Sequence, residues 1–324
     1  MQLRRVALSL ALLAALAVPA PLLAADYPTR AVKIICPFPA GGTADILARL
    51  VAQLLQEAWT HPVVVENRAG AAGNIGADMV AKAEPDGYTL LVSPPPPLAV
   101  NMSLYKAMPF DARTAFSYIS IVAQSPSVFA VNPRTPYRSV AEFLAFARAN
   151  PGKVNYATQG NGTTSHLTTA MLATQRDLQM THIPYRGSAP ALTDLLAGQV
   201  DIMFDNLGSS LGHIKAGSLR ALAVAGQNRA EGLPDVPTMV ESGFPGFISV
   251  AWFGVAAPAR TPGEAINIIS GHLQRGLRKP EIRERLAGIG VDPVGGTPAE
   301  MTKFVGEEMA RWAAVIQSAN VKVD

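Results

Sequence analysis

Short apolar runs alternate with helical patterns along the chain from residue 31 onward. Strands are predicted at Ala31–Cys36, Val63–Glu66 and Tyr88–Ser93, and a helix at Gly76–Ala83. Between the first two strands, Thr43–Ala58 carries apolar residues at helical spacing, on a stripe formed by Ile46, Leu47, Leu50, Val51, Leu54 and Leu55. This β-α-β-α-β order predicts a parallel sheet covered by helices.

The same alternation resumes after Pro126. The predicted strands of this second series are Val128–Val131, Val154–Ala157, Met180–Pro184, Ile202–Phe204, Leu219–Ala225 and Val250–Ala257. Its predicted helices are Ser139–Ala149, Thr163–Thr174 and Ala189–Ala197, and three more follow near 263–277, 280–288 and 298–318. Ser139 is a suitable N-cap because Glu142 follows three residues later. The pattern therefore predicts a second α/β unit and a helical tail.

The length of the chain favours two lobes over one core. About 300 residues remain after the N-terminal segment, which is more than a single hydrophobic core usually holds. We predict lobe 1 at 26–126 plus 251–324 and lobe 2 at 127–250, with a hinge where the chain crosses near 126 and 251. Two domains without this interchange are the alternative. Ligands of open α/β sheets bind beyond the carboxyl ends of the strands, so a cleft between two such ends predicts a binding site.

The N-terminus has the three parts of a secretory signal. Arg4 and Arg5 come first, Val6–Val18 carries no charge, and Ala24 and Ala25 precede Asp26. The apolar run is shorter than the roughly 20 residues that span a membrane. We therefore predict a signal peptide at residues 1–25, cleaved after Ala25 or after Ala24, with an uncleaved anchor as the alternative.

Charge and cysteine content exclude several functions. Removing residues 1–25 takes away two of the 27 basic residues and none of the 24 acidic ones, which leaves a formal charge of +1. No run of lysine or arginine occurs, so nucleic acid binding is unsupported. Cys36 is the sole cysteine, which excludes an intrachain disulfide and a cysteine zinc site, and its place at the end of an apolar run predicts a core residue.

A first candidate site follows the first predicted strand. Gly41 and Gly42 let the backbone approach a ligand, and the N-terminus of the next helix supplies unpaired N–H donors and partial positive charge. Together they predict an anion site that needs no lysine or arginine. Its candidate residues are Phe38, Pro39, Ala40, Gly41, Gly42, Thr43 and Asp45. The alternative is a tight turn capped by Thr43 or Asp45, and the missing Lys-Ser/Thr pair excludes a phosphate loop.

A second candidate site has the same form in the other lobe. It lies between a predicted strand and helix and comprises Gly160, Asn161, Gly162, Thr163, Thr164 and Ser165. Two helix N-termini, one from each lobe, would hold an anion from both sides. We interpret His166 as a packed or capping residue, because no nucleophile motif accompanies it. The five histidines have no metal-ligand spacing and no His-Glu-x-x-His occurs, so neither a metal nor catalysis is predicted.

Further candidates follow later strands. Tyr185 and Gly187 flank Arg186, which either pairs with a ligand carboxylate or, as we expect, occupies the surface. Asp205 is predicted to accept from a ligand amine or hold a water, or else to cap the following helix. The glycine-rich stretch Asn67–Gly76 resembles a dinucleotide fingerprint only weakly, because its spacing is wrong, and we interpret it as a loop leading into a helix.

Taken in order, several motifs resemble the Bug receptors, the extracytoplasmic solute receptors of the tripartite tricarboxylate transporter family. The matching stretches are Asp26–Arg30, Pro37–Asp45, Val65–Gly76, Pro85–Leu90, His182–Gly187, Leu195–Asp201 and Leu233–Thr238. One departure follows Ser93, a further candidate ligand residue, where Pro94–Pro97 replace small polar residues. The prolines remove N–H donors and predict either a stiffer, more apolar pocket wall or a rigid surface turn.

The resemblance implies a function as well as a fold. It implies a two-lobed periplasmic binding protein of the type II class, each lobe a mixed, mostly parallel sheet covered by helices. The expected ligands are small carboxylates, amino acids or aromatic acids, bound by Phe38–Asp45 and Gly160–Ser165 and also by Tyr185, Gly187 and Asp205. The expected partners are integral membrane transporter subunits; we expect a monomer without cofactor. A sensing subunit for a membrane signalling system and a secreted enzyme on the same scaffold are the alternatives.

Overall fold

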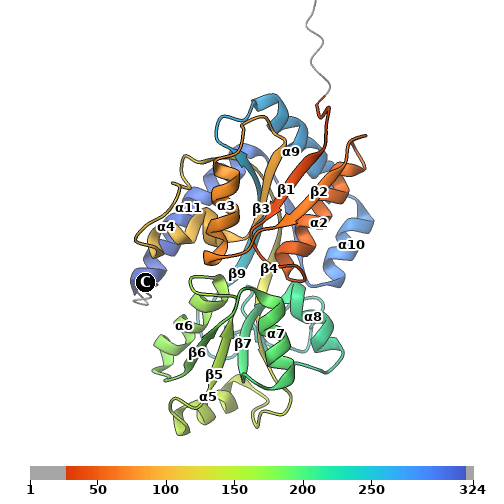
Figure 1. Ribbon diagram of the computed structural model, residues 1–324. Coiled ribbons are helices and arrows are strands. Elements are labelled where there is room, and N and C mark those ends of the chain that lie inside the picture. Colours follow the sequence, from red (N-terminus) through yellow and green to blue (C-terminus); the bar gives the residue numbers. More distant parts are fainter. Residues whose placement is uncertain (1–26, 319–324) are drawn as a thin grey trace, which may run out of the picture.

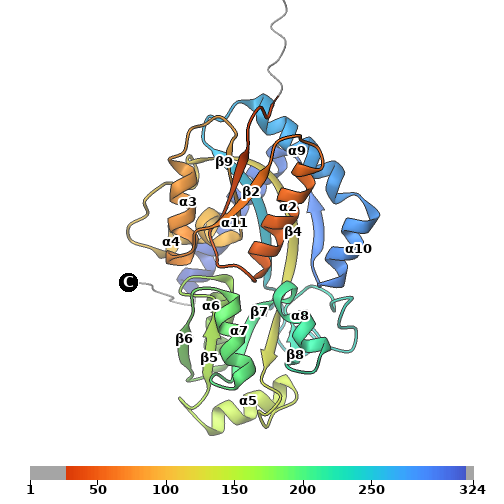
Figure 2. The ribbon, with the colours of Figure 1, turned by 45° about the vertical axis from the view of Figure 1, so that its right-hand side comes forward.

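The computed structural model describes residues 27–318 as two lobes, one above the other in Figures 1 and 2. Lobe one is built on strands β1 (Val32–Cys36), β2 (Val63–Asn67), β3 (Thr89–Ser93), β9 (Val250–Pro258) and β10 (Asp292–Gly295). Lobe two is built on β5 (Asn155–Thr158), β6 (Thr181–Pro184), β7 (Ile202–Asn206) and β8 (Arg220–Val224), and the 16-residue strand β4 (Phe116–Val131) belongs to both. The predicted signal segment, residues 1–25, lies outside the described residues.

Lobe one is a mixed sheet with helices on both faces. Strand β1 lies between β2 and β3 and is parallel to both, whereas β9 is antiparallel to β3. The helical elements are α2 (Thr43–Gln56), η1 (Ala71–Gly73), α3 (Asn74–Ala81), η2 (Pro96–Val100), α4 (Asn101–Leu104), α9 (Gly263–Leu277), α10 (Pro280–Gly288) and α11 (Pro298–Ser318). The predicted stripe of α2 is confirmed, because Leu47, Leu50, Val51 and Leu54 are at most 4% exposed and pack in the core.

Lobe two repeats the arrangement with its own core. Strand β5 is parallel to β6 and β7, and β7 is antiparallel to β4. The covering helices are α5 (Val140–Ala149), α6 (Thr164–Arg176), α7 (Ser188–Ala197) and α8 (Leu207–Lys215). Ser139 caps α5 as predicted, since its side chain accepts from the Glu142 N–H. The core centres on Phe129, whose ring stacks on Phe204 at 4.6 Å between centroids.

Strand β4 changes partners where the lobes meet. It pairs with β9 as far as Pro126 opposite Val250, and from Ser127 onward it pairs with β7 and β8. The chain therefore passes between the two sheets at this point and again just before β9. The predicted boundaries near 126 and 251 stay a prediction, and this exchange of partners is the geometry that they require.

The proline run after β3 is buried, which excludes the predicted alternative of a surface turn. Pro94–Pro97 are all buried, and Pro96 and Pro97 open η2, a π-helical turn that continues into α4. A Cβ added at Gly73 would lie 3.1 Å from Cγ of Pro97, so the run packs beneath the loop that precedes α3. Neither η2 nor α4 is predicted from the sequence, because prolines rarely mark a helix interior.

Candidate functional site

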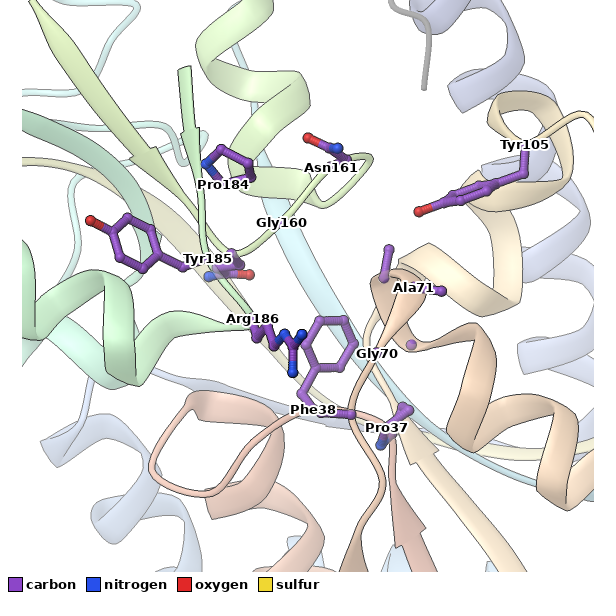
Figure 3. Close-up of a pocket in the computed structure, with 14 residues that line it drawn as sticks. Pro37, Phe38, Gly70, Ala71, Tyr105, Gly160, Asn161, Pro184, Tyr185 and Arg186 are labelled. Atoms are coloured by element: carbon purple, nitrogen blue, oxygen red, sulfur yellow. The ribbon is translucent and has the colours of Figure 1, made fainter. Parts of the chain in front are cut away.

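A cavity of about 260 Å³ lies between the two lobes (Figure 3). Lobe one contributes Pro37, Phe38, Ala69, Gly70, Ala71, Ala72, Gly73 and Tyr105 to its wall. Lobe two contributes Gln159, Gly160, Asn161, Pro184, Tyr185 and Arg186. All of these residues lie at the end of a strand or on a segment that follows one, except Tyr105, so the cavity has the position expected for a ligand of two facing α/β sheets.

The lobe-one wall contains an unusual stretch of backbone. Gly70, Ala71, Ala72 and Gly73 have φ angles of 137°, 46°, 49° and 89°. Two consecutive alanines in the left-handed region cost roughly 1–2 kcal/mol each, and such strain concentrates at functional sites. Within residues 27–318, no acceptor contacts the N–H of Ala71 or Ala72. Two residues with unpaired backbone N–H groups therefore line the cavity in this turn.

The lobe-two wall is a glycine loop held from behind. Gly160 and Gly162 have φ angles of 121° and 77°, a conformation that requires glycine. The Gly160 N–H donates to Thr158 Oγ1, and the Gly162 N–H donates to His166 Nδ1. Between them, Asn161 lines the cavity, and its N–H has no acceptor among the described residues. Each lobe thus contributes residues with unpaired backbone N–H groups to the wall of the same cavity.

His166 supports this loop, which confirms its interpretation as a packed, capping residue. Its ring stacks on His182 at 4.3 Å between centroids, and His182 stacks in turn on Tyr156. Burial lowers the pKa of both histidines to about 4. His166 is therefore neutral at pH 7, and its Nδ1 can accept from Gly162. Protonation of Nδ1 would break that hydrogen bond.

Asp45 faces its own loop and not the cavity. Its carboxylate accepts from the Gly41 N–H and from Asn67 Nδ2, and it pairs with Arg49. Burial by itself would raise the Asp45 pKa, but the hydrogen bonds from Arg49, Gly41 and Asn67 lower it below its ordinary value. Because Asn67 Nδ2 also donates to the carbonyl of Phe38, Asp45 fixes the loop that places Phe38 on the cavity wall.

The rest of that loop lies against lobe two. A Cβ added at Gly41 would lie 3.5 Å from Cβ of Ala189, and one added at Gly187 would lie 2.7 Å from Pro39. Thr43 Oγ1 donates to Ser209 Oγ, and Ala40 is exposed. The two glycine-rich predicted sites therefore do front the same inter-lobe space, but only Phe38 of the first site lines the cavity.

Other predicted residues are buried behind the wall. Thr163, Thr164 and Ser165 are at most 3% exposed, and Thr163 caps α6 by accepting from the His166 N–H. Ser93 is fully buried and donates to the carbonyl of Pro94. Asp205 is also fully buried, and both of its oxygens are occupied by donors of lobe two. Direct ligand contacts by these residues stay predictions that the geometry does not favour.

Tyr185 and Arg186 line the cavity in different ways. The Tyr185 ring turns away from the cavity in Figure 3 and donates to Asp194 at 2.6 Å, and burial with this contact raises the Tyr185 pKa to about 12. Arg186 is exposed, as predicted, but its side chain also reaches the cavity beside Phe38. Among residues 27–318, Arg186 is the one charged residue of the wall, and nothing pairs with its guanidinium.

The sequence analysis missed part of the wall. Its missed members are Pro37, Ala69, Gly70, Ala71, Ala72, Gly73, Tyr105, Gln159 and Pro184. The signal for the largest group is the pair of glycines that flank Ala71 and Ala72, which we interpreted only as a loop. Tyr105 has no local signal, because it comes directly after α4, an element that is not predicted.

One sequence motif of hydrolases is present, but its serine is not placed to act as a nucleophile. Gly208–Gly212 reads Gly-Ser-Ser-Leu-Gly, the spacing of a nucleophile elbow, which weakens the sequence-based argument against an enzyme. An elbow serine is exposed, whereas Ser210 is fully buried and donates to Asp205 Oδ2 at 2.6 Å. Within the described part of the chain, His, Cys, Asp and Glu residues form no group of three able to hold a metal ion.

Two α/β lobes that enclose a small cavity lined by both define a solute-binding receptor. The family model described as "Tripartite tricarboxylate transporter family receptor" matches residues 47–321. The chain therefore belongs to this family of periplasmic solute receptors.

Individual relatives agree with this assignment. Protein BugT of Bordetella pertussis is 39% identical over 305 residues, which cover 94% of each chain. An R. palustris protein solved with adipate is 38% identical, with a TM-score of 0.90 over 92% of this chain and 99% of that one. MatC from Rhodopseudomonas palustris, solved with bound malate, is 29% identical, with a TM-score of 0.85 over 90% of this chain and all of that one. The two-lobed fold and the Bug-type resemblance are thus confirmed.

Proposed function

We propose that this protein captures a small carboxylate-bearing molecule between its lobes and delivers it to integral membrane subunits of a tripartite tricarboxylate-type transporter. The observation that carries the proposal is the cavity with unpaired amides of Ala71 and Ala72 on one side and of Asn161 on the other. Backbone N–H groups that converge from two sides bind a carboxylate without a dedicated lysine or arginine.

Arg186 narrows the class of ligand to dicarboxylates. A first carboxylate on the backbone amides leaves the guanidinium of Arg186 free to pair with a second one. An unpaired guanidinium favours a carboxylate because the two groups form parallel, charge-assisted hydrogen bonds. Two related receptors, with bound adipate and bound malate, support this ligand class.

The proposal also includes export of the protein to the periplasm and a role limited to binding. The arginine pair followed by an apolar run at Val6–Val18 supports secretion into the periplasm with loss of residues 1–25. We propose that the protein does not convert its ligand, because the described residues that line the cavity include no nucleophile paired with a general base. Among residues 27–318, no helix is long and apolar enough to cross a membrane.

Thermal unfolding with a panel of solutes tests this function. The panel contains adipate, malate, aspartate, nicotinate and hexanoate, with adipamide as the neutral counterpart of adipate. Binding to the folded state raises the melting temperature with ligand concentration. We expect adipate or malate to raise it, adipamide to have no effect, and mass spectrometry to recover the acid unchanged. Equal stabilisation by adipamide, no response to any acid, or conversion of the acid would contradict the proposal.

A further inference from the structure

Three helices begin at one point of contact between the lobes. The N-terminus of α2 in lobe one lies above those of α7 and α8 in lobe two (Figure 2). A Cβ added at Gly42, the residue before α2, would lie 3.5 Å from Cβ of Ser188, the first residue of α7. One added at Gly208, the second residue of α8, would lie 2.9 Å from Cγ2 of Thr43. Each N-terminus carries about half a positive charge, so bringing three together is unfavourable unless a negative group compensates.

Asp205 is that negative group. It is fully buried at the end of β7, and its Oδ1 accepts from Gln159 Nε2 at 2.7 Å and from Ser188 Oγ at 2.8 Å. Its Oδ2 accepts from Ser209 Oγ and Ser210 Oγ, both at 2.6 Å. Four donors on two oxygens are what a buried carboxylate requires. The carboxylate therefore belongs to the lobe contact, and its four donors leave no acceptor position open for a ligand amine, which was one of its predicted partners.

A chain of hydroxyl groups extends this cluster across the lobe boundary. Thr43 Oγ1 donates to Ser209 Oγ at 3.3 Å, and Ser209 Oγ donates to Asp205. The close approach depends on Gly208, because a Cβ there would lie 2.7 Å from Val291 and 2.9 Å from Thr43, both of lobe one. No other group of lobe two approaches that position as closely, so the absent side chain of Gly208 serves the inter-lobe contact and not the core of its own lobe.

We propose that this contact is a closure latch, in which Asp205 neutralises the three converging helix N-termini and Gly208 admits Thr43. The latch stabilises the arrangement in which the lobes touch, and it lies outside the cavity wall. It therefore sets how long any ligand stays bound, without selecting which ligand binds. Asp205, Ser209 and Thr43 are positioning residues in this scheme.

The test compares two glycines of the same helix. Gly208→Ala inserts a methyl group between the lobes, whereas Gly212→Ala, one helical turn later, meets nothing within 4 Å. Both substitutions favour the helix itself. Spin labels at Val64→Cys in lobe one and Lys153→Cys in lobe two, both exposed positions, report the distance between lobes, while Cys36 is buried and stays unlabelled.

We expect Gly208→Ala to lengthen the inter-lobe distance in the ligand-free protein, and Gly212→Ala to leave it unchanged. With adipate as the probe, Gly208→Ala should raise Kd at least about five-fold, mainly through faster dissociation, without lowering the ligand-free melting temperature. Thr43→Val should raise Kd about three- to ten-fold by removing one hydrogen bond across the boundary. A loss shared equally by malate and adipate supports the latch.

Two results would overturn the latch. One is a Gly208→Ala protein with the same distances as Gly212→Ala and the wild type. The other is a ligand-free melting temperature that falls in Gly208→Ala, because the substitution would then act on the fold of lobe two. The latch does not depend on the ligand class, since the ligand-free distances test it even where adipate fails to bind and the proposed function is wrong.

Discussion

Replacing Arg186 by methionine removes the one charge of the cavity wall and keeps a flexible side chain of moderate length. A hydrogen bond to a charged group contributes about 1.5–3 kcal/mol when buried, and an exposed ion pair about 0.2–1 kcal/mol. Arg186 is exposed yet lines the cavity, so a value between these limits applies. A loss of about 1–2 kcal/mol of binding free energy corresponds to a roughly five- to thirty-fold rise in Kd.

Isothermal titration calorimetry with two ligands of equal chain length isolates this contribution. Adipate has carboxylates at both ends, whereas hexanoate has one, which the backbone amides of Ala71, Ala72 and Asn161 would hold. We expect Arg186→Met to raise the Kd of adipate by the stated factor and to change the Kd of hexanoate by less than about two-fold. Only the second carboxylate of adipate would contact Arg186. Arg186→Lys is the control that keeps the charge. An equal loss for both acids, or none for adipate, would refute the assignment of Arg186.

Three further outcomes are expected. Gly42→Val should abolish stabilisation by adipate, because its branched side chain meets Ser188 across the lobe boundary; retained stabilisation in thermal melts would contradict the geometry. Asp205→Asn should raise the Kd of aspartate and the Kd of malate by the same factor in calorimetry. A larger loss of affinity for aspartate would show that Asp205 binds the ligand amine. Burial lowers the pKa of His166 and His182 to about 4, below the ordinary 6.5, so the unfolded chain takes up protons first as pH falls. The free energy of unfolding should thus decrease from about pH 6.5 to 4 by roughly 1.4 kcal/mol per pH unit for each histidine, and urea unfolding of a His166→Gln, His182→Gln protein should lack this part of the slope.

Local sequence patterns predicted much of the fold. The α2 stripe, the Ser139 cap and the tail helices are short-range patterns, and the structure confirms α9, α10 and α11 at the predicted residues. Strand β4 was predicted only at its last four residues, Val128–Val131, because the preceding residues mix serines with apolar residues. Those serines are accommodated by burial between β9 and β10, a long-range pairing that no local pattern reports.

The candidate site divides in the same way. The glycine loops after β1 and β5 could be found because glycines between a strand and a helix are a local signal. The sequence could not predict which loop lines the cavity and which contacts the other lobe. Gly41 and Gly42 contact lobe two, whereas Ala71 and Ala72 line the cavity in a left-handed turn that alanine seldom adopts. Composition gives no warning of such a turn, since alanine ordinarily favours a right-handed helix.

By itself, the sequence determined two α/β lobes, a packed His166 and two glycine-rich loops at strand ends, and it predicts an export signal, because each of these patterns depends on neighbours a few residues apart. Only the tertiary structure decided which loop residues reach the cavity, that Asp205 is enclosed by four donors, and that Gly208 faces Thr43 across the boundary. The enclosure of Asp205 depends on how the segments of lobe two fold together, and the other two facts depend on how the two lobes approach each other. The hydrogen bond between Thr43 and Ser209 joins residues 166 positions apart, and local propensity carries no information about it.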